Sequence, residues 1–200
     1  MKFVSCTLFI FLSIGCKNTV NEHVDYTSIP PINPDSTVNM IVEIPAGTTA
    51  KYEMSKTTHQ LVMDSIDNLP RYINYLGYPG NYGMIPNTLL AENMGGDGDP
   101  LDILLLGPSA KRGSIHKVSV IGVLELLDNR NQDDKLIAID PESQWKAVED
   151  ASDLDSLYPG TKTIISTFFE SYKGKGKMQL KGWADKRRAK EVLLKSLISK

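Results

Sequence analysis

The chain has 200 residues, of which 41% are hydrophobic and 23% charged, an ordinary composition for one globular domain with a buried core. Its formal net charge of −2 argues against a general nucleic-acid-binding protein. We therefore expect no nucleic-acid partner.

The N-terminal segment has the pattern of an export signal. Lys2 precedes an apolar run over residues 3–14, which is short for a membrane span and ends at Ser13-Ile14-Gly15-Cys16. These last four residues resemble the lipobox of bacterial lipoproteins, in which the cysteine is acylated, although Ser13 stands where Leu is usual. We expect a signal peptide over residues 1–15 and a lipid on Cys16 that anchors an exported protein to a bacterial membrane, on the periplasmic side or in the cell envelope. An ordinary signal peptide, or a cytoplasmic protein, is the alternative.

A polar segment follows the cysteine. Residues 17–37 contain Pro30, Pro31 and Pro34 and show neither a helical nor a strand period. We interpret residues 16–37 as the lipidated cysteine with an extended tether, and residues 38–200 as the domain.

Most of the strands are predicted in the first part of the domain. Val38 to Ile44 alternates in the way of a strand, and the turn cluster Asp128-Asn129-Arg130-Asn131 separates two β-rich segments that suit a hairpin. The other predicted strands are Ala50–Met54, Leu101–Leu106, Val118–Leu127 and Lys135–Ile139.

Helices are predicted mainly near the C-terminus. Apolar residues repeat at helical spacing from Thr161 to Tyr172, and Asp185 is placed to cap a last helix with Ala189, Val192, Leu193 and Leu197 on its inner face. A short strand is predicted between them, from Met178 to Trp183. Strands followed by helices indicate an α+β fold, and we expect a closed β-barrel with helices packed outside it.

The densest chemical signal is Asp97-Gly98-Asp99-Pro100-Leu101-Asp102, where three carboxylates fall within six residues. Crowded carboxylates repel one another unless they are solvated, paired or bound to a cation, and hard divalent cations prefer oxygen ligands. The alternative is a turn that binds nothing. An EF-hand is excluded, since Leu101, Asp102 and Pro108 stand where the loop needs an oxygen ligand, glycine and glutamate.

Two further segments suit an anionic ligand. Asp128, Asp133 and Asp134 flank the predicted hairpin tip and are followed by Lys135, although ordinary surface turns also look like this. The segment from Arg71 to Gly83 contains four tyrosines, which are either structural or offer hydroxyls to an anion. Carboxylates for Mg²⁺, together with cations such as Lys51 and Lys173, are what phosphate chemistry requires.

These motifs, in this order, resemble the soluble family I inorganic pyrophosphatases from about Val38 to Trp183. The segment Asp97-Gly98-Asp99-Pro100-Leu101-Asp102-Ile103 matches that family's signature at every position. The other matching segments are Ile41-Val42-Glu43-Ile44-Pro45, Lys51-Tyr52-Glu53, Tyr78-Pro79-Gly80-Asn81-Tyr82-Gly83, Gly122-Val123-Leu124, Asp133-Asp134-Lys135, Phe168-Phe169-Glu170 and Tyr172-Lys173.

The resemblance implies a closed five-stranded barrel of the OB type and Mg²⁺-dependent hydrolysis of inorganic diphosphate to two phosphates. It implies that Asp97, Asp102, Asp128 and Asp133 bind metal, that Asp99 accepts a proton from the attacking water, and that Glu43, Glu53 and Tyr78 support the site. It assigns phosphate binding to Lys51, Arg71, Tyr82, Lys135, Tyr172 and Lys173. We also expect a homo-oligomer.

The chain departs from the family pattern in two places. Asn129 stands where an acidic residue is common, and the stretch from Ser55 to Pro70 has an unusual length, which makes Arg71 the least secure assignment. Two alternative functions remain open at this point: a hydrolase of another phosphoanhydride, and a surface protein that binds cations without catalysis.

Overall fold

The computed structural model describes residues 24–90, 96 and 98–198, which are built around a mixed seven-stranded sheet. Five strands follow one another in space and pair in a circuit, because the last also pairs with the first. In that order they are β1 (Val38–Ile44), β6 (Asn81–Met84), β7 (Asp102–Leu106), β10 (Lys135–Ile139) and β8 (Ile115–Asp128). The pairing of β7 with β10 is parallel, whereas the other pairings of the circuit are antiparallel.

The long strand β8 makes the circuit possible. Its first residues, Ile115 to Val118, pair with β1, and the rest of the strand lies between β10 and β11 (Met178–Ala184). At its far end β8 turns through Asn129 and Arg130 into the short β9 (Asn131–Gln132). Both turn residues have positive φ, at 48° and 79°, as a tight hairpin requires.

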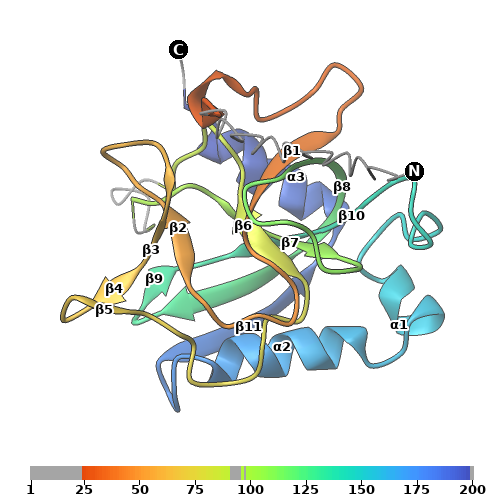
Figure 1. Ribbon diagram of the computed structural model, residues 1–200. Helices are drawn as coiled ribbons and strands as arrows, with labels where there is room; N and C mark the ends of the chain where they lie inside the picture. Colours follow the sequence, from red (N-terminus) through yellow and green to blue (C-terminus); the bar gives the residue numbers. More distant parts are fainter. Residues whose placement is uncertain (1–23, 91–95, 97, 199–200) are drawn as a thin grey trace, which may run out of the picture.

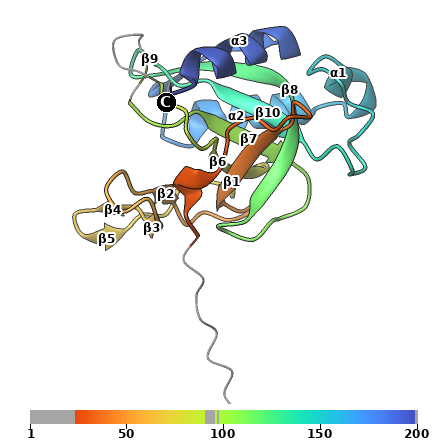
Figure 2. The ribbon, with the colours of Figure 1, turned by 90° about the horizontal axis from the view of Figure 1, so that it is seen from above.

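Helices cover the sheet on two sides (Figures 1 and 2). α2 (Thr161–Ser171) packs on β11 and buries Ile165, Phe168 and Phe169, while α3 (Lys186–Ser196) packs on β8. Asp185 caps α3 by accepting a hydrogen bond from the Arg188 N–H at 2.8 Å. A short helix, α1 (Asp153–Leu157), precedes α2. Among the described residues, no helix combines the length and apolar character needed to cross a bilayer.

Two small hairpins extend from this body (Figure 2). The first pairs β2 (Tyr52–Met54) with β3 (Leu61–Met63), and the second pairs β4 (Ser65–Ile66) with β5 (Leu69–Pro70). We call residues 51–71 the arm. Unlike the strands of the circuit, the strands of the arm are half-buried or exposed along their whole length.

Every strand and helix expected from the sequence is present within one to three residues of its expected bounds, but several elements were not predicted. β6 lies in the segment interpreted as a tyrosine-rich loop; it is buried throughout, and Gly83 is needed there because a Cβ would collide with the Ile41 carbonyl of β1. Within the arm β2 was predicted, but β3, β4 and β5 were missed, as were β9 and α1, since segments this short carry almost no periodicity.

The last part of the segment expected to be an extended tether packs against the domain instead. A 3₁₀ turn, η1 (Tyr26–Ser28), lies against the domain, where the Tyr26 hydroxyl donates to the Gly113 carbonyl at 3.1 Å. The Asn87 amide donates to the Ile29 carbonyl at 2.7 Å, so these residues are fixed by side chains from distant parts of the chain. The expected signal peptide and Cys16 lie outside the described residues.

Candidate active site

A cleft of about 540 Å³ opens between the sheet and the arm. It gathers every described residue that the sequence assigned to the site; Asp97 lies outside the described residues. Its described lining holds six carboxylates and five cations, together with three tyrosines. These are Glu43, Glu53, Asp99, Asp102, Asp128 and Asp133; Lys51, Lys56, Arg71, Lys135 and Lys173; and Tyr78, Tyr82 and Tyr172. Such a mixture suits a ligand that combines metal cations with a polyanion.

A buried lysine organises the wall of the cleft that the sheet provides. Lys135 begins β10 directly beside Asp102, which begins the parallel strand β7, and its side chain is only 1% exposed. Its ammonium donates hydrogen bonds to Asp102 Oδ2 and, at 2.6 Å, to Asp133 Oδ1. Burial alone would lower the pKa of Lys135, but Asp102 and Asp133 outweigh it and hold that pKa well above its usual value. Lys135 therefore stays charged and holds the two aspartates together.

The hairpin after β8 brings a third aspartate to the same place. Asp128 ends β8, and its Oδ2 lies 2.6 Å from the ammonium of Lys173, which follows α2. The second oxygen of Asp133 lies 3.8 Å from the same ammonium, is buried, and accepts no hydrogen bond from any described residue. Burial raises the pKa of Asp133, an effect that Lys135 partly offsets. A buried carboxylate oxygen without a donor is a position that a cation would stabilise.

The donor set fits Mg²⁺ in kind. Asp102, Asp128 and Asp133 offer the hard oxygen atoms that this ion prefers, and they lie in one cleft that a polyanion could share. Within the described part of the chain, no three acidic, histidine or cysteine side chains are already arranged as a metal site. Lys135 and Lys173 occupy the positions between these carboxylates, so metal binding requires the two ammonium groups to shift or to share the oxygens.

The arm forms the opposite wall. Asp64 accepts a hydrogen bond from Arg71 Nη1 at 2.8 Å, and the same oxygen lies 3.3 Å from Lys51 Nζ, which also contacts Glu53 at 2.7 Å. Burial would raise the pKa of Asp64, but Arg71 and Lys51 lower it below its usual value. Asp64 was not singled out from the sequence, because a lone aspartate in a segment of unusual length gives no signal. It places Arg71 beside the cleft despite that length.

Asp99, the expected proton acceptor, also meets the arm. Its Oδ1 lies 2.5 Å from Lys56 Nζ, and both side chains are more than half exposed. Lys56 is another cleft residue that the sequence did not reveal, since an isolated surface lysine is unremarkable. The contact joins the Asp99 turn to the β2–β3 hairpin at the rim of the cleft.

Three buried tyrosines line the cleft. Tyr78, Tyr82 and Tyr172 are buried in an aromatic cluster in which the Tyr172 ring stacks on Phe168 with centroids 5.3 Å apart. Burial raises the pKa of all three, so they remain neutral hydrogen-bond donors. The two other tyrosines of the segment from Arg71 to Gly83, Tyr72 and Tyr75, are exposed and do not line the cleft.

Glu43 joins the two walls. It lies on β1, and its Oε1 accepts a hydrogen bond from the Met54 N–H of the arm at 2.9 Å. Burial, with a further contribution from Asp102, raises the pKa of Glu43 from 4.5 to about 8. At neutral pH the metal-free protein therefore holds a largely protonated carboxyl at this joint.

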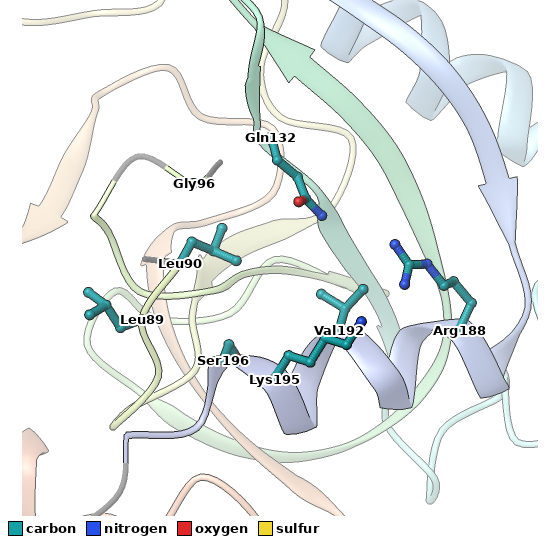
Figure 3. Close-up of a pocket in the computed structure, with 8 residues that line it drawn as sticks. All are labelled: Leu89, Leu90, Gly96, Gln132, Arg188, Val192, Lys195 and Ser196. Atoms are coloured by element: carbon teal, nitrogen blue, oxygen red, sulfur yellow. The ribbon is translucent and has the colours of Figure 1, made fainter. Parts of the chain in front are cut away.

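A different cavity, of about 340 Å³, lies beside α3 and is shown in Figure 3. Leu89, Leu90 and Val192 supply apolar surface, and Arg188 and Lys195 supply positive charge. None of its described lining residues is a carboxylate, so it offers no oxygen set for a divalent cation. The cleft between sheet and arm is the candidate active site.

The comparison with protein families and solved structures agrees with this geometry. The family model described as inorganic pyrophosphatase matches residues 40–199. Inorganic pyrophosphatases of Gluconobacter oxydans and Mesorhizobium japonicum are each 36% identical to the chain, over 80% and 82% of it and 89% and 90% of their own lengths. The solved inorganic pyrophosphatase of Schistosoma japonicum superposes with a TM-score of 0.80 at 29% identity, covering 84% of the chain and 68% of that structure. The solved inorganic pyrophosphatase of Helicobacter pylori superposes with a TM-score of 0.71 at 31% identity, covering 85% of the chain and 96% of that structure. The chain belongs to the inorganic pyrophosphatase family.

Proposed function

We propose that the cleft hydrolyses inorganic diphosphate to two phosphates with the help of Mg²⁺. The observation that carries this assignment is the convergence of six carboxylates and five cations on one cleft in a member of this family. Carboxylates alone would suit a cation store, and cations alone would suit a phosphate-binding protein. Both together suit hydrolysis of a metal-bound polyanion. We further infer that the five-strand circuit is the closed barrel expected from the sequence.

We assign different roles to the carboxylates of the cleft. Asp102, Asp128 and Asp133, with Asp97, would hold Mg²⁺, while Glu43, Glu53 and Tyr78 would support them. When bound, Mg²⁺ lowers the pKa of a coordinated water and neutralises phosphate charge. Asp99, a half-exposed residue that lines the cleft, would take the proton of the attacking water.

The cations and phenols would hold the substrate. Lys51 and Arg71 face the cleft from the arm, and Lys173 with Tyr172 faces it from the end of α2, so a diphosphate would be gripped from both sides. Positive charge at the leaving phosphate stabilises the transition state. Lys135 and Tyr82 are almost fully buried, and their charged ammonium and neutral hydroxyl would donate to phosphate oxygens.

Phosphate release from diphosphate tests the assignment. We expect release with Mg²⁺ and none after chelation, with recovery when Mg²⁺ is restored. Retained Mg²⁺ binding without any release would indicate a cation-binding protein instead. Faster release from nucleotides than from diphosphate would favour the hydrolase of another phosphoanhydride.

We also propose that the enzyme is exported and held at a bacterial membrane by a lipid on Cys16. The signal-like segment that ends at Ser13-Ile14-Gly15-Cys16 supports this, as does the polar segment that follows it. Acyl chains provide about 0.8 kcal/mol of membrane affinity per buried methylene. Cys16→Ala should move the protein from the membrane fraction to the soluble fraction with unchanged kcat. A wild-type protein that is wholly soluble and unmodified at Cys16 by mass spectrometry would contradict the anchor.

A homo-oligomer is part of the same proposal. Leu157 of α1 and Ile164 of α2 are large apolar side chains that are 48% and 64% exposed, and a subunit contact would cover such side chains. Light scattering should report a mass above that of one chain, and Ile164→Lys should lower it. A monomeric wild-type protein would contradict this expectation.

A further inference from the structure

The C-terminal part of the chain carries a large excess of positive charge. Residues 173–198 contain nine Lys or Arg residues and two Asp or Glu residues, a net charge of +7 in a chain whose total is −2. Figure 2 shows α3 on the outside of the molecule, away from the arm. Five of the nine cations lie on this helix, and they are Lys186, Arg187, Arg188, Lys190 and Lys195.

The exposed face of α3 combines this charge with an apolar side chain. The buried residues of the helix, which packs on β8, are Ala189, Val192, Leu193 and Ser196. Arg187, Lys190 and Leu194 follow one another on the opposite side at positions i, i+3 and i+7. Leu194 is 50% exposed, and Lys195 is exposed beside it. A basic helix face with an exposed leucine is typical of helices that lie on a membrane surface.

Part of the charge on this face is unbalanced. Both arginines of α3 have carboxylate partners at 3.0 to 3.8 Å, which are Glu125, Asp185 and Glu191. Lys190 and Lys195, by contrast, form no ion pair with any residue that the structure describes. These two ammonium groups are therefore available to an anionic partner.

The stability of the helix does not account for its cations. The N-terminal end of a helix carries partial positive charge, so cations in the first turn destabilise it. α3 nevertheless begins with Lys186, Arg187 and Arg188 and has no acidic residue in its first turn. Lys195, in the last turn, has the sign that the helix dipole favours. Most of the positive charge thus lies where the helix by itself would be more stable without it.

The N-terminal segment brings the proposed lipid anchor to the same side of the domain. The Asn87 side-chain amide donates to the Ile29 carbonyl at 2.7 Å, and the Ile198 N–H, just after α3, donates to the Asn87 carbonyl at 3.2 Å. The N-terminal segment and the C-terminal end of α3 therefore meet at one residue. From Cys16 to Val24, the first described residue, the chain can reach at most about 29 Å, so an anchored domain stays close to the membrane.

We propose that the exposed face of α3 docks on the anionic phospholipid headgroups of the membrane to which Cys16 is anchored. The inference rests on the proposed lipid anchor and adds an electrostatic contact to it. Each lysine or arginine near an anionic membrane strengthens binding roughly fivefold. Leu194 would enter the interface between the lysines. None of the described residues that line the cleft belongs to α3, so docking leaves the cleft open to its substrate.

The arm is the competing surface. Gln60 Nε2 donates to the Val24 carbonyl at 3.4 Å, so the arm also lies beside the N-terminal segment, and Ile66 on it is 56% exposed. Residues 51–71 contain three Lys or Arg residues and three Asp or Glu residues, so the arm offers no net charge to an anionic surface. We therefore expect the membrane to contact α3 and not the arm.

The experiment places a fluorescent probe on each surface of the full chain, made in a bacterium that exports it. Cys6 would leave with the signal peptide and Cys16 would carry the lipid, so Leu194→Cys or Ile66→Cys supplies the one free thiol for labelling. The protein is reconstituted into vesicles of phosphatidylglycerol or of phosphatidylcholine that contain spin-labelled lipid. The probe at position 194 should be quenched in phosphatidylglycerol, and the probe at position 66 in neither lipid.

Charge variants test the cause of the contact. Lys190→Gln combined with Lys195→Gln should lower the equilibrium constant for contact of the position 194 probe roughly 25-fold. Lys111→Gln combined with Lys146→Gln is the matched control, because it removes the same charge from two exposed lysines outside α3. It should leave the contact within twofold. Raising the salt concentration should weaken the contact of the unsubstituted face by screening.

The outcomes separate the two proposals. An unquenched probe at position 194, equal quenching of both probes, or equal effects of the two double variants would overturn docking through α3, while the anchor and the hydrolase stand. If mass spectrometry finds no lipid on Cys16, the anchor fails. The same probes in a chain with Cys6→Ala and Cys16→Ala, mixed with the same vesicles, then decide the docking surface. Binding to duplex DNA that is tighter than binding to these vesicles, and that depends on Lys190 and Lys195, would overturn the membrane as the partner.

Discussion

The two walls of the cleft both carry charged side chains, but these are buried and paired on the sheet and more exposed on the arm. On the sheet, Lys135 and Asp133 are 1% and 7% exposed and are tied to each other and to Asp102. On the arm, Lys51, which directly precedes β2, and Glu53, which lies on it, are 20% and 50% exposed. Buried charges must be paired and hydrogen-bonded, whereas exposed charges are screened by water and interact weakly. We therefore expect substitutions in the sheet wall to change both stability and catalysis, and substitutions in the arm to change mainly substrate binding.

Removing the buried lysine should have the largest effect. Lys135→Met leaves Asp102 and Asp133 buried without their cation, which typically costs about 3–5 kcal/mol of unfolding free energy. We expect denaturant unfolding to show this loss and diphosphate hydrolysis to be abolished. Lys51→Met on the arm is the matched control and should cost less than about 1 kcal/mol. Equal losses in the two variants would show that the walls do not differ in the way described.

The second prediction separates charge from structure on the sheet wall. Asp102→Asn keeps an oxygen that can accept from Lys135 but removes the charge that a divalent cation needs. We expect kcat/KM to fall by at least about 100-fold, with the circular dichroism spectrum unchanged and a stability loss smaller than that of Lys135→Met. Most of the activity surviving at saturating Mg²⁺ would show that Asp102 does not hold metal.

Glu43 belongs to the sheet and contacts the arm, so it tests how the two walls are joined. Its pKa is raised from 4.5 to about 8 in the folded protein, so between these values the unfolded chain releases a proton that the folded chain keeps. Stability attributable to Glu43 is therefore fully present below pH 4.5 and is lost as the pH rises to about 8.

Glu43→Gln should remove this dependence. In the presence of a chelator, the variant should match the wild type near pH 4 and exceed its unfolding free energy by roughly 1–4 kcal/mol above pH 8. Unfolding curves at several pH values provide the measurement. Glu53→Gln, on the exposed part of the arm, is the control and should show no such divergence. Parallel stability curves for the wild type and Glu43→Gln would contradict the burial of an ionisable group at the joint.

The contrast between the walls also explains what the sequence could predict. Asp102 and Lys135 begin strands of five residues that are otherwise unbroken apolar runs, and Asp133 lies two residues before Lys135, so the sequence could predict that these side chains lie at strand ends. The arm consists of strands of two or three residues; β2 lies within the predicted strand Ala50–Met54, whereas β3, β4 and β5 were missed because such short segments have almost no period to detect. Asp64 and Lys56 acquire their positions only from this tertiary arrangement, so nothing in their local sequence distinguishes them from surface residues.

The smallest effect is expected on the arm, at Arg71. Its guanidinium is held by Asp64 at 2.8 Å, and Arg71 lines the cleft. Arg71→Lys keeps the positive charge but loses the planar donor pair that grips a phosphate, a change that typically corresponds to about 1 kcal/mol. We expect KM for diphosphate to rise roughly fivefold, with kcat within twofold and stability unchanged. Asp64→Asn should raise KM in the same direction, because it leaves Arg71 without its charged anchor. A fall in kcat with constant KM would instead place Arg71 in contact with the transition state alone, and the arm would then take part in catalysis as fully as the sheet.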